Sequence, residues 1–354
     1  MNDGPHRTHS VLPRRFGLIG WTLVLALTAL LVLTTCGRPA RPPVPPAPAP
    51  ATFPPPTAIA TATGPFDAGP VAAPATGAYL GAWVRPDRLT QPQRVAAVSG
   101  LETRLGRRLD IVHTYRRFDQ ELLTNSDLTF TERGSTIMIS WAGGDTRAIT
   151  MGRYDGVIHD GAIAAKDFGK PLLLRFRWEM DRPGMAAAIW SPADYIAAWR
   201  HVRAIFADER VTNVSWVWCP SNDGFVGGYA APFYPGDDQV DWVCVDVYAA
   251  TKLAPLGSLL TPFLEWSARH PTKPIMIGEF GVARAWGTAT RAAWLREAAL
   301  VFKANPQIRA VLYFDSDPDN GDGTPQQQFR ISDDPTVLAA FTELAREPYF
   351  NPRR

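Results

Sequence analysis

Eight short apolar runs, spread over residues 78–315, constrain the fold of this chain more than any other feature. Most of them are continuously apolar rather than alternating, as is typical of strands that are buried on both faces. Stretches with helical periodicity separate them. Strands that alternate with helices predict an α/β fold in which a parallel sheet closes on itself, a (β/α)8 TIM barrel. We expect strands at Ala78–Val84, Leu109–His113, Thr136–Trp141, Pro171–Trp178, Val214–Cys219, Asp241–Tyr248, Pro274–Glu279 and Ala310–Asp315.

Three helices between or after these strands are clear in the sequence. Ser191–Ala207 has Ser191 as a capping residue, proline in its first turn and an apolar face. Thr290–Ala304 has the same helical periodicity. Asp334–Arg346 closes the chain, with Asp334 in the capping position.

The first 36 residues differ from the rest and predict an export signal. A polar segment with Arg14 and Arg15 precedes Leu18–Leu33, a 16-residue run without charge. The run is shorter than the roughly 20 residues of a spanning helix, and a basic flank before a short apolar core is typical of a signal peptide. Cys36 follows Thr34-Thr35, which resembles a bacterial lipoprotein cleavage site. Lipidation at Cys36 and an uncleaved anchor both remain open, and either holds the protein on the outer face of the membrane or in the cell wall.

Residues 37–76 contain thirteen prolines and cannot form a core, so we expect a disordered, semi-rigid linker. We expect residues 77–354 to form a single domain of roughly 275 residues, a common size for an α/β barrel enzyme. The net charge is only +2 and no basic stripe is present, which argues against nucleic acid as a partner. We expect a monomer without a cofactor.

Cysteine usage gives no sign of a metal site. Apart from Cys36 the chain has only Cys219 and Cys244, which lie on neighbouring predicted strands. Export makes a disulfide between them possible, and two buried thiols are the alternative. The acidic segment Asp315–Gly323 lacks the terminal Glu of a calcium loop, so we expect a polar turn there and no bound metal.

Polar and aromatic residues end or follow most of the predicted strands. A barrel core does not need this pattern, but a site at the C-terminal face of a barrel does. Two of these residues are glutamates, and we expect Glu179 to end the fourth strand and Glu279 the seventh. Strands four and seven lie nearly opposite one another in a ring of eight, so the two carboxylates can face each other. Such a pair suits a retaining glycosidase, with one carboxylate as nucleophile and the other as acid/base.

Neighbouring residues support this pair. Arg175 lies four residues before Glu179, on the same face of an extended strand, and can favour an ionised carboxylate. Tyr248 ends the strand next to that of Glu279 and can donate to it. His113 and Asp315, also at strand ends, are weaker candidates, and a structural role is more common for a lone His.

The chain has twelve tryptophans, and indole rings stack on the apolar faces of sugars. Five fall at strand ends or in the following loops, where sugar contact and barrel packing are comparable alternatives. They are Trp83, Trp141, Trp178, Trp218 and Trp286.

Four segments resemble glycoside hydrolase family 26, a β-mannanase family with a retaining barrel and glutamates on strands four and seven. They are KPLLLRFRWEMD, VSWVWCPSND, YPGDDQVDWVCVDVYA and KPIMIGEFG, in the family's order. The resemblance covers most of residues 77–345. It implies Glu179 as acid/base, Glu279 as nucleophile, Tyr248 as a contact of the nucleophile, and a β-mannan as substrate.

One departure concerns the residue before the acid/base. The family usually has His there, followed by Met-Asn-Gly, whereas this chain has Trp178 and, after Glu179, Met180-Asp181-Arg182. Indole neither titrates nor accepts a hydrogen bond. Mannan specificity is therefore open, with β-glucan or xylan as alternatives. A glycan-binding surface protein on the same scaffold, without catalysis, is a further hypothesis, and a purely structural wall protein leaves the polar strand ends unexplained.

Overall fold

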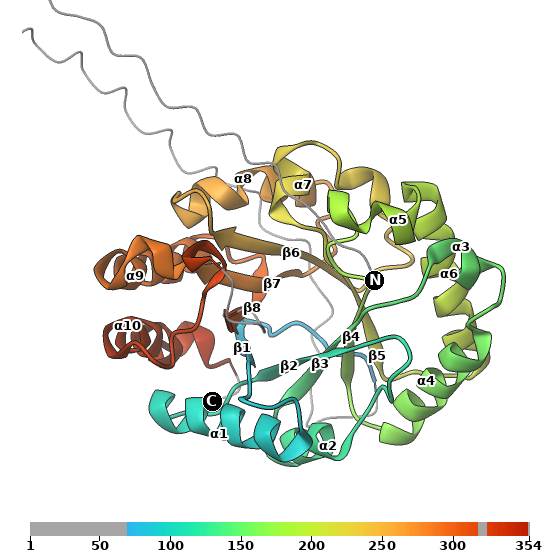
Figure 1. Ribbon diagram of the computed structural model, residues 1–354, viewed down its shortest axis with the longest axis horizontal. Helices are drawn as coiled ribbons and strands as arrows, with labels where there is room; N and C mark the ends of the chain where they lie inside the picture. Colours follow the sequence, from blue (N-terminus) through green and yellow to red (C-terminus); the bar gives the residue numbers. More distant parts are fainter. Residues whose placement is uncertain (1–68, 318–323, 353–354) are drawn as a thin grey trace, which may run out of the picture. The chain divides into compact units, whose positions relative to one another are not determined.

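The computed structural model describes residues 69–317 and 324–352, and within them a ring of helices surrounds an eight-stranded parallel barrel (Figure 1). Each strand pairs in parallel with the next, and β8 pairs with β1. The predicted TIM barrel is confirmed. The strands are β1 Tyr79–Val84, β2 Ile111–Arg116, β3 Thr136–Trp141, β4 Leu172–Phe176, β5 Val214–Trp218, β6 Trp242–Ala249, β7 Ile275–Val282 and β8 Ile308–Asp315.

The helices lie outside the sheet, and the three that the sequence predicts are present with bounds shifted by one or two residues. The helices are α1 Gln91–Leu105, α2 Asn125–Glu132, α3 Thr146–Thr150, α4 Asp155–Phe168, α5 Ala186–Ile189, α6 Pro192–Asp208, α7 Asn222–Val226, α8 Leu256–Ser267, α9 Thr288–Ala304 and α10 Pro335–Arg346. Both predicted caps are made, since Ser191 accepts from the Asp194 N–H and Asp334 from the Val337 N–H. None of the helices in the described ranges combines the length and hydropathy that crossing a bilayer requires.

Strand alternation sorts the side chains into two apolar cores. Outward residues such as Ile137 and Leu174 pack beneath the helices, while inward residues such as Met138 and Leu173 fill the barrel. The inward positions change character along each strand. On β4, inward Leu173 is followed by inward Arg175, and on β3 inward Met138 is followed by Ser140. The barrel interior is therefore apolar near its N-terminal end and polar near its C-terminal end, where barrel enzymes place their sites.

The N-terminal end of the barrel is closed by a short segment that precedes β1. Val71 and Ala73 are buried and belong to the same apolar cluster as the inward strand residues. The Val71 N–H donates to Ser215 Oγ at 2.7 Å, and the indole of Trp242 donates to the Val71 carbonyl at 3.1 Å. Ser215 and Trp242 lie at or next to the starts of β5 and β6. We call residues 69–76 the floor segment.

The floor segment corrects the predicted domain boundary. Residues 37–76 were predicted as linker, but Val71 and Ala73 are packed because the open end of the barrel offers an apolar surface to cover. The folded domain therefore starts ahead of residue 77. The predicted signal, residues 1–36, and the linker up to residue 68 lie outside the described residues, as do residues 318–323 of the predicted polar turn.

Candidate active site

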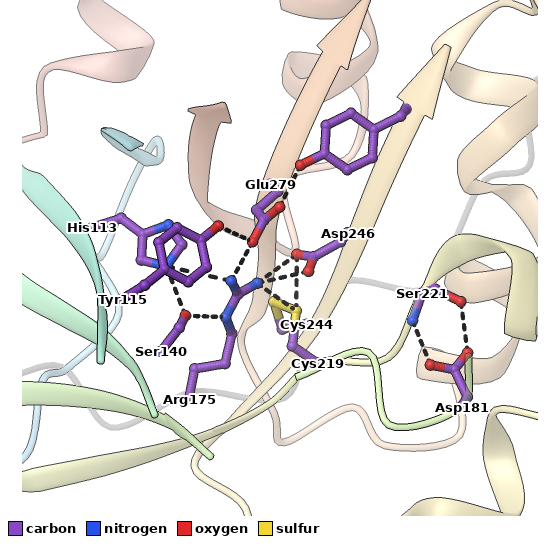
Figure 2. Close-up of a disulfide and its surroundings, with 11 residues drawn as sticks. His113, Tyr115, Ser140, Arg175, Asp181, Cys219, Ser221, Cys244, Asp246 and Glu279 are labelled. Carbon is purple, nitrogen blue, oxygen red and sulfur yellow. Dashed lines mark hydrogen bonds and ion pairs between the residues drawn. A yellow bond between two sulfur atoms is a disulfide. The ribbon is translucent and has the colours of Figure 1, made fainter. Parts of the chain in front are cut away.

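Arg175 lies at the centre of a buried ionic network at the C-terminal end of the barrel (Figure 2). Its fully buried guanidinium donates to both oxygens of Asp246 at 2.7 Å, to Ser140 Oγ at 2.6 Å and to Glu279 Oε1. Burial alone lowers the pKa of Arg175, but the Asp246 and Glu279 carboxylates outweigh it and raise that pKa above its usual value. Arg175 is therefore a fixed cation from which the two carboxylates are positioned.

Glu279 has both carboxylate oxygens held by donors. Tyr115, from β2, donates to Oε1 at 2.5 Å, and Tyr248, from β6, donates to Oε2. Only 5% of Glu279 is exposed. Burial, followed by the charge of Glu279, raises the pKa of both tyrosines well above the usual range, so each phenol keeps the proton that it donates. With Arg175, these two phenols give the carboxyl group three donors, one of them cationic, which fix its position.

A bulge in β7 turns Glu279 towards the barrel axis. Val245 of β6 pairs with Ile277, but the next residue, Asp246, pairs with Glu279, so Gly278 is an extra residue. Without it, alternation would point Glu279 outward, since Ile277 already faces the helices. Glycine is needed at the bulge because a Cβ there would lie 2.5 Å from Cys244 Sγ and 2.8 Å from Asp246 Oδ1.

Glu179 lies in the loop after β4 rather than on the strand. β4 ends at Phe176, and Glu179 has a φ of 50°, a left-handed conformation that non-glycine residues seldom adopt. The Glu179 N–H donates to the Cys219 carbonyl at 2.8 Å, which fixes the loop to the end of β5. A strained backbone held by its neighbours is common at functional sites.

The protonation state of Glu179 is set by opposing neighbours. Burial first, and then the negative charge of Glu279, raise the pKa of Glu179, while Arg182 and Arg175 lower it, with a net increase. Arg182 Nη1 lies 2.8 Å from Glu179 Oε2. Because one carboxyl group is held by three donors and the other has a raised pKa, the two are suited to different roles.

Two of the predicted tryptophans lie beside the site. The ring of Trp83, on the inward face of β1, is 5.0 Å from the ring of Tyr115. The ring of the half-buried Trp178 is 5.2 Å from the ring of Tyr115, and its centre is 5.5 Å from the Arg175 guanidinium carbon. Trp178 thus contacts the residues that hold Glu279.

The other three tryptophans and Asp315 make contacts with other parts of the barrel and its loops. Trp141 and Trp218 are outward residues of β3 and β5, buried at 1% and 0% exposure under the helices, so no sugar can stack on them. Strand alternation explains both positions. Trp286 is half-buried after β7, and its indole donates to the Ala249 and Ala250 carbonyls. Asp315 is buried and accepts from the Ile331 N–H at 2.7 Å, which makes it a loop support.

His113, on β2, contacts two members of the network, Ser140 and Arg175. Its Nε2 lies 2.7 Å from Ser140 Oγ and 3.3 Å from Arg175 Nη2. Burial, followed by the Arg175 charge, lowers the pKa of His113 well below its usual value, so the ring is neutral at neutral pH. The neutral ring therefore lies beside the Arg175 guanidinium without adding a second positive charge.

Cys219 and Cys244 form a disulfide between β5 and β6, next to Asp246. The two sulfur atoms and the Asp246 carboxylate are the one cluster of three metal-ligand side chains within residues 69–317 and 324–352. Because the sulfur atoms are bonded to each other, this cluster is not a metal site.

Sequence reasoning missed Tyr115, Ser140 and Arg182. The second strand was predicted to end at His113, whereas β2 continues to Arg116 and brings Tyr115 inward. The sequence contains the signal, because Tyr115 lies two residues beyond His113 and so on the same face. No comparable signal marks Arg182, since its contact depends on the loop conformation.

No family model matches the chain. Two curated proteins are similar to it, each at 28% identity: endoglucanase H of Acetivibrio thermocellus over 300 residues, and beta-1,3-xylanase TXYA of a Vibrio species over 145 residues. The matches cover 78% and 38% of this chain, and 31% and 29% of the relatives' own lengths. The matched region thus spans under a third of either relative.

Solved structures with the same fold include family 26 β-mannanases. The enzyme from Bacteroides ovatus aligns with a TM-score of 0.57 at 15% identity, over 78% of this chain and 90% of that one. The endo-β-1,4-mannanase from Cellulomonas fimi aligns with a TM-score of 0.59 at 19% identity, over 77% and 71%. These likenesses agree with the barrel fold of the chain.

Proposed function

We propose that the chain is a retaining glycoside hydrolase that cleaves β-glycosidic bonds in a polysaccharide, with Glu279 as nucleophile and Glu179 as acid/base. The observation that carries the proposal is the contrast between the two carboxyl groups. Glu279 is held by Arg175, Tyr115 and Tyr248, whereas the pKa of Glu179 is raised. Double displacement needs one ionised and one protonated carboxyl group at the same pH.

The two steps follow from these states. Glu279 attacks the anomeric carbon while Glu179 gives its proton to the departing oxygen, which leaves a glycosyl ester on Glu279. Glu179, now ionised, takes a proton from water as that water attacks the anomeric carbon and releases Glu279. Tyr115 and Tyr248 hold the Glu279 oxygens in place for both steps.

For the substrate we propose a β-1,4-mannan, on the basis of the four matching segments and the mannanase structures. A β-glucan or a xylan is the second candidate, favoured by Trp178 and by the two curated relatives, whose names describe an endoglucanase and a β-1,3-xylanase. A panel of mannan, mixed-linkage β-glucan, cellulose and xylans, with reducing-end detection, separates these candidates. Absence of cleavage throughout the panel, together with binding to one glycan, would favour the non-catalytic alternative.

The catalytic roles are tested by substitution. Glu279→Ala is expected to abolish hydrolysis, and Glu179→Ala to reduce it by about 10²–10⁴-fold. Glu297→Ala, which removes an exposed carboxylate from α9, is the matched control. NMR of the first product should show the β-anomer. An α-anomer, or an undiminished rate for a folded Glu279→Ala variant, refutes the mechanism.

We further propose that the protein is exported and stays attached at the outer face of the membrane or wall through lipidated Cys36. The support is the sequence of residues 1–36 together with the Cys219–Cys244 disulfide, since such bonds persist in oxidising compartments. Cell fractionation of wild type and Cys36→Ala tests the lipid. Release of the variant into the medium supports lipidation, while unchanged membrane retention favours an uncleaved anchor.

A further inference from the structure

Arg182 forms an ion pair with the carboxyl group of Glu179, the group that donates the proton in the proposed mechanism. Its Nη1 lies 2.8 Å from Glu179 Oε2, but the two partners differ in exposure, with 60% of the Arg182 side chain and 14% of the Glu179 side chain accessible. The backbone around Arg182 is fixed, because its N–H donates to the Glu179 carbonyl and its own carbonyl accepts from the Met185 N–H. The side chain alone can therefore leave without moving the loop.

This contact conflicts with acid catalysis. A guanidinium only donates hydrogen bonds, so it pairs with the ionised form of Glu179 and competes with a proton on that carboxyl group. The other groups that act on Glu179 come from inside the barrel. Glu279 on β7 favours the protonated form and Arg175 on β4 opposes it, and Asp246 and Tyr248 on β6 also interact with Glu179. Of the two cations, only Arg182 is exposed, and besides Glu179 the Asp223 carboxylate at the start of α7 attracts it.

We propose that Arg182 is a displaceable cap on Glu179, closed in the free protein and moved aside when a sugar occupies the leaving-group side of the site. Departure of Arg182 frees Oε2 for the glycosidic oxygen and leaves Glu179 to hold its proton. Return of Arg182 favours the ionised carboxylate that activates water in the second step. The inference rests on the proposed function and adds a positioning residue to it.

If Arg182 acts as this cap, the pH profiles of kcat/KM and of kcat should differ. The basic limb of the kcat/KM profile reports the pKa of Glu179 in the free protein, where Arg182 is paired with Glu179. The basic limb of the kcat profile reports the pKa of Glu179 in the substrate complex, where Arg182 has moved aside. In wild type the kcat/KM limb should therefore lie at lower pH than the kcat limb. Arg182→Gln should move the kcat/KM limb upward by about 0.5 pH unit, a size typical of a partly exposed ion pair, and leave the kcat limb in place.

Two variants control this experiment. Arg182→Lys keeps the charge and should retain most of the separation between the limbs. Arg117→Gln removes another exposed arginine that pairs with a nearby carboxylate, that of Asp119 at 3.0 Å, and should change neither limb. Carbon-13 NMR titration of the Glu179 carboxyl group in the free proteins gives the same comparison without turnover, with a higher pKa expected in Arg182→Gln.

The outcomes distinguish the cap from the proposed function. Hydrolysis with coincident limbs in wild type, or with both limbs shifted equally by Arg182→Gln, overturns the cap alone. An unchanged Glu179 titration in Arg182→Gln does the same. A wild-type protein that hydrolyses no glycan of the panel overturns the proposed function and the cap with it.

Discussion

Replacing Arg175 by Met should destabilise the protein, because the buried carboxylate of Asp246 loses the cation with which it is paired. The methionine fills much of the same space, so the main loss is the charge and its hydrogen bonds rather than volume. Asp246 has a fully buried side chain, and its charge is paired with Arg175 at 2.7 Å. Glu279 keeps two phenol donors after the substitution, whereas Asp246 keeps no cation.

The magnitude follows from that geometry. Breaking a buried ion pair by removing one partner costs about 3–5 kcal/mol, a large part of the 5–15 kcal/mol by which proteins are stable. For a domain of this size the loss corresponds to a Tm lower by roughly 10 °C. The double variant Arg175→Met/Asp246→Asn removes the unpaired charge as well, so it should recover part of the loss.

The stability lost in Arg175→Met should also depend on pH, and the direction of that dependence follows from the pKa of Asp246. Burial raises the pKa of Asp246 well above its unfolded value of 3.8, despite Arg175, and removal of Arg175 raises that pKa further. A carboxyl group with a raised folded pKa contributes stability below that pKa, and the contribution is lost as the pH rises through it. The destabilisation of Arg175→Met should therefore be smaller at pH 5 than at pH 8.

Urea unfolding of wild type, the single variant and the double variant at both pH values measures these differences. A single variant as stable as wild type, or one that loses more stability at pH 5 than at pH 8, refutes the account of the network. A double variant no more stable than the single one shows that the lost donors of Arg175, and not the stranded charge, dominate.

Three further predictions concern the site and its supports. Tyr248→Phe should lower kcat/KM by about 10–100-fold, because a hydrogen bond to a charged group contributes about 1.5–3 kcal/mol, and a steady-state assay that shows no loss would contradict this role. Gly278→Ala should cost about 1–3 kcal/mol in thermal unfolding because its Cβ would overlap Cys244 and Asp246, whereas Gly156→Ala on α4, with nothing within 4 Å, should be neutral or stabilising; equal effects would count against the bulge argument. A chain that starts at Gly77 should be about 2–4 kcal/mol less stable than one that starts at Gly69, with the same kcat, and equal stabilities would mean that the floor segment contributes nothing.

The fold was predictable from the sequence because apolar runs and helical periodicity both depend on burial, which the sequence expresses locally. The site was predictable only in part. Glu279 could be assigned to β7, but its inward direction depends on the bulge at Gly278, which is a matter of register with β6. Parity along a strand would have placed Trp141 and Trp218 outward, and the position of Glu179 beyond the end of β4 could not be inferred from alternation at all.

The floor segment has a consequence for how this domain can be joined to others. The chain enters at the N-terminal end of the barrel, and its other described end reaches the same side, since the Ala78 N–H, just before β1, donates to the Tyr349 carbonyl at 2.9 Å. Both connections therefore lie on the side away from the two glutamates. Neighbouring modules, a surface attachment or a purification tag can be added at either end without covering the mouth of the barrel. A domain with this arrangement can be joined to further modules while its C-terminal face stays open.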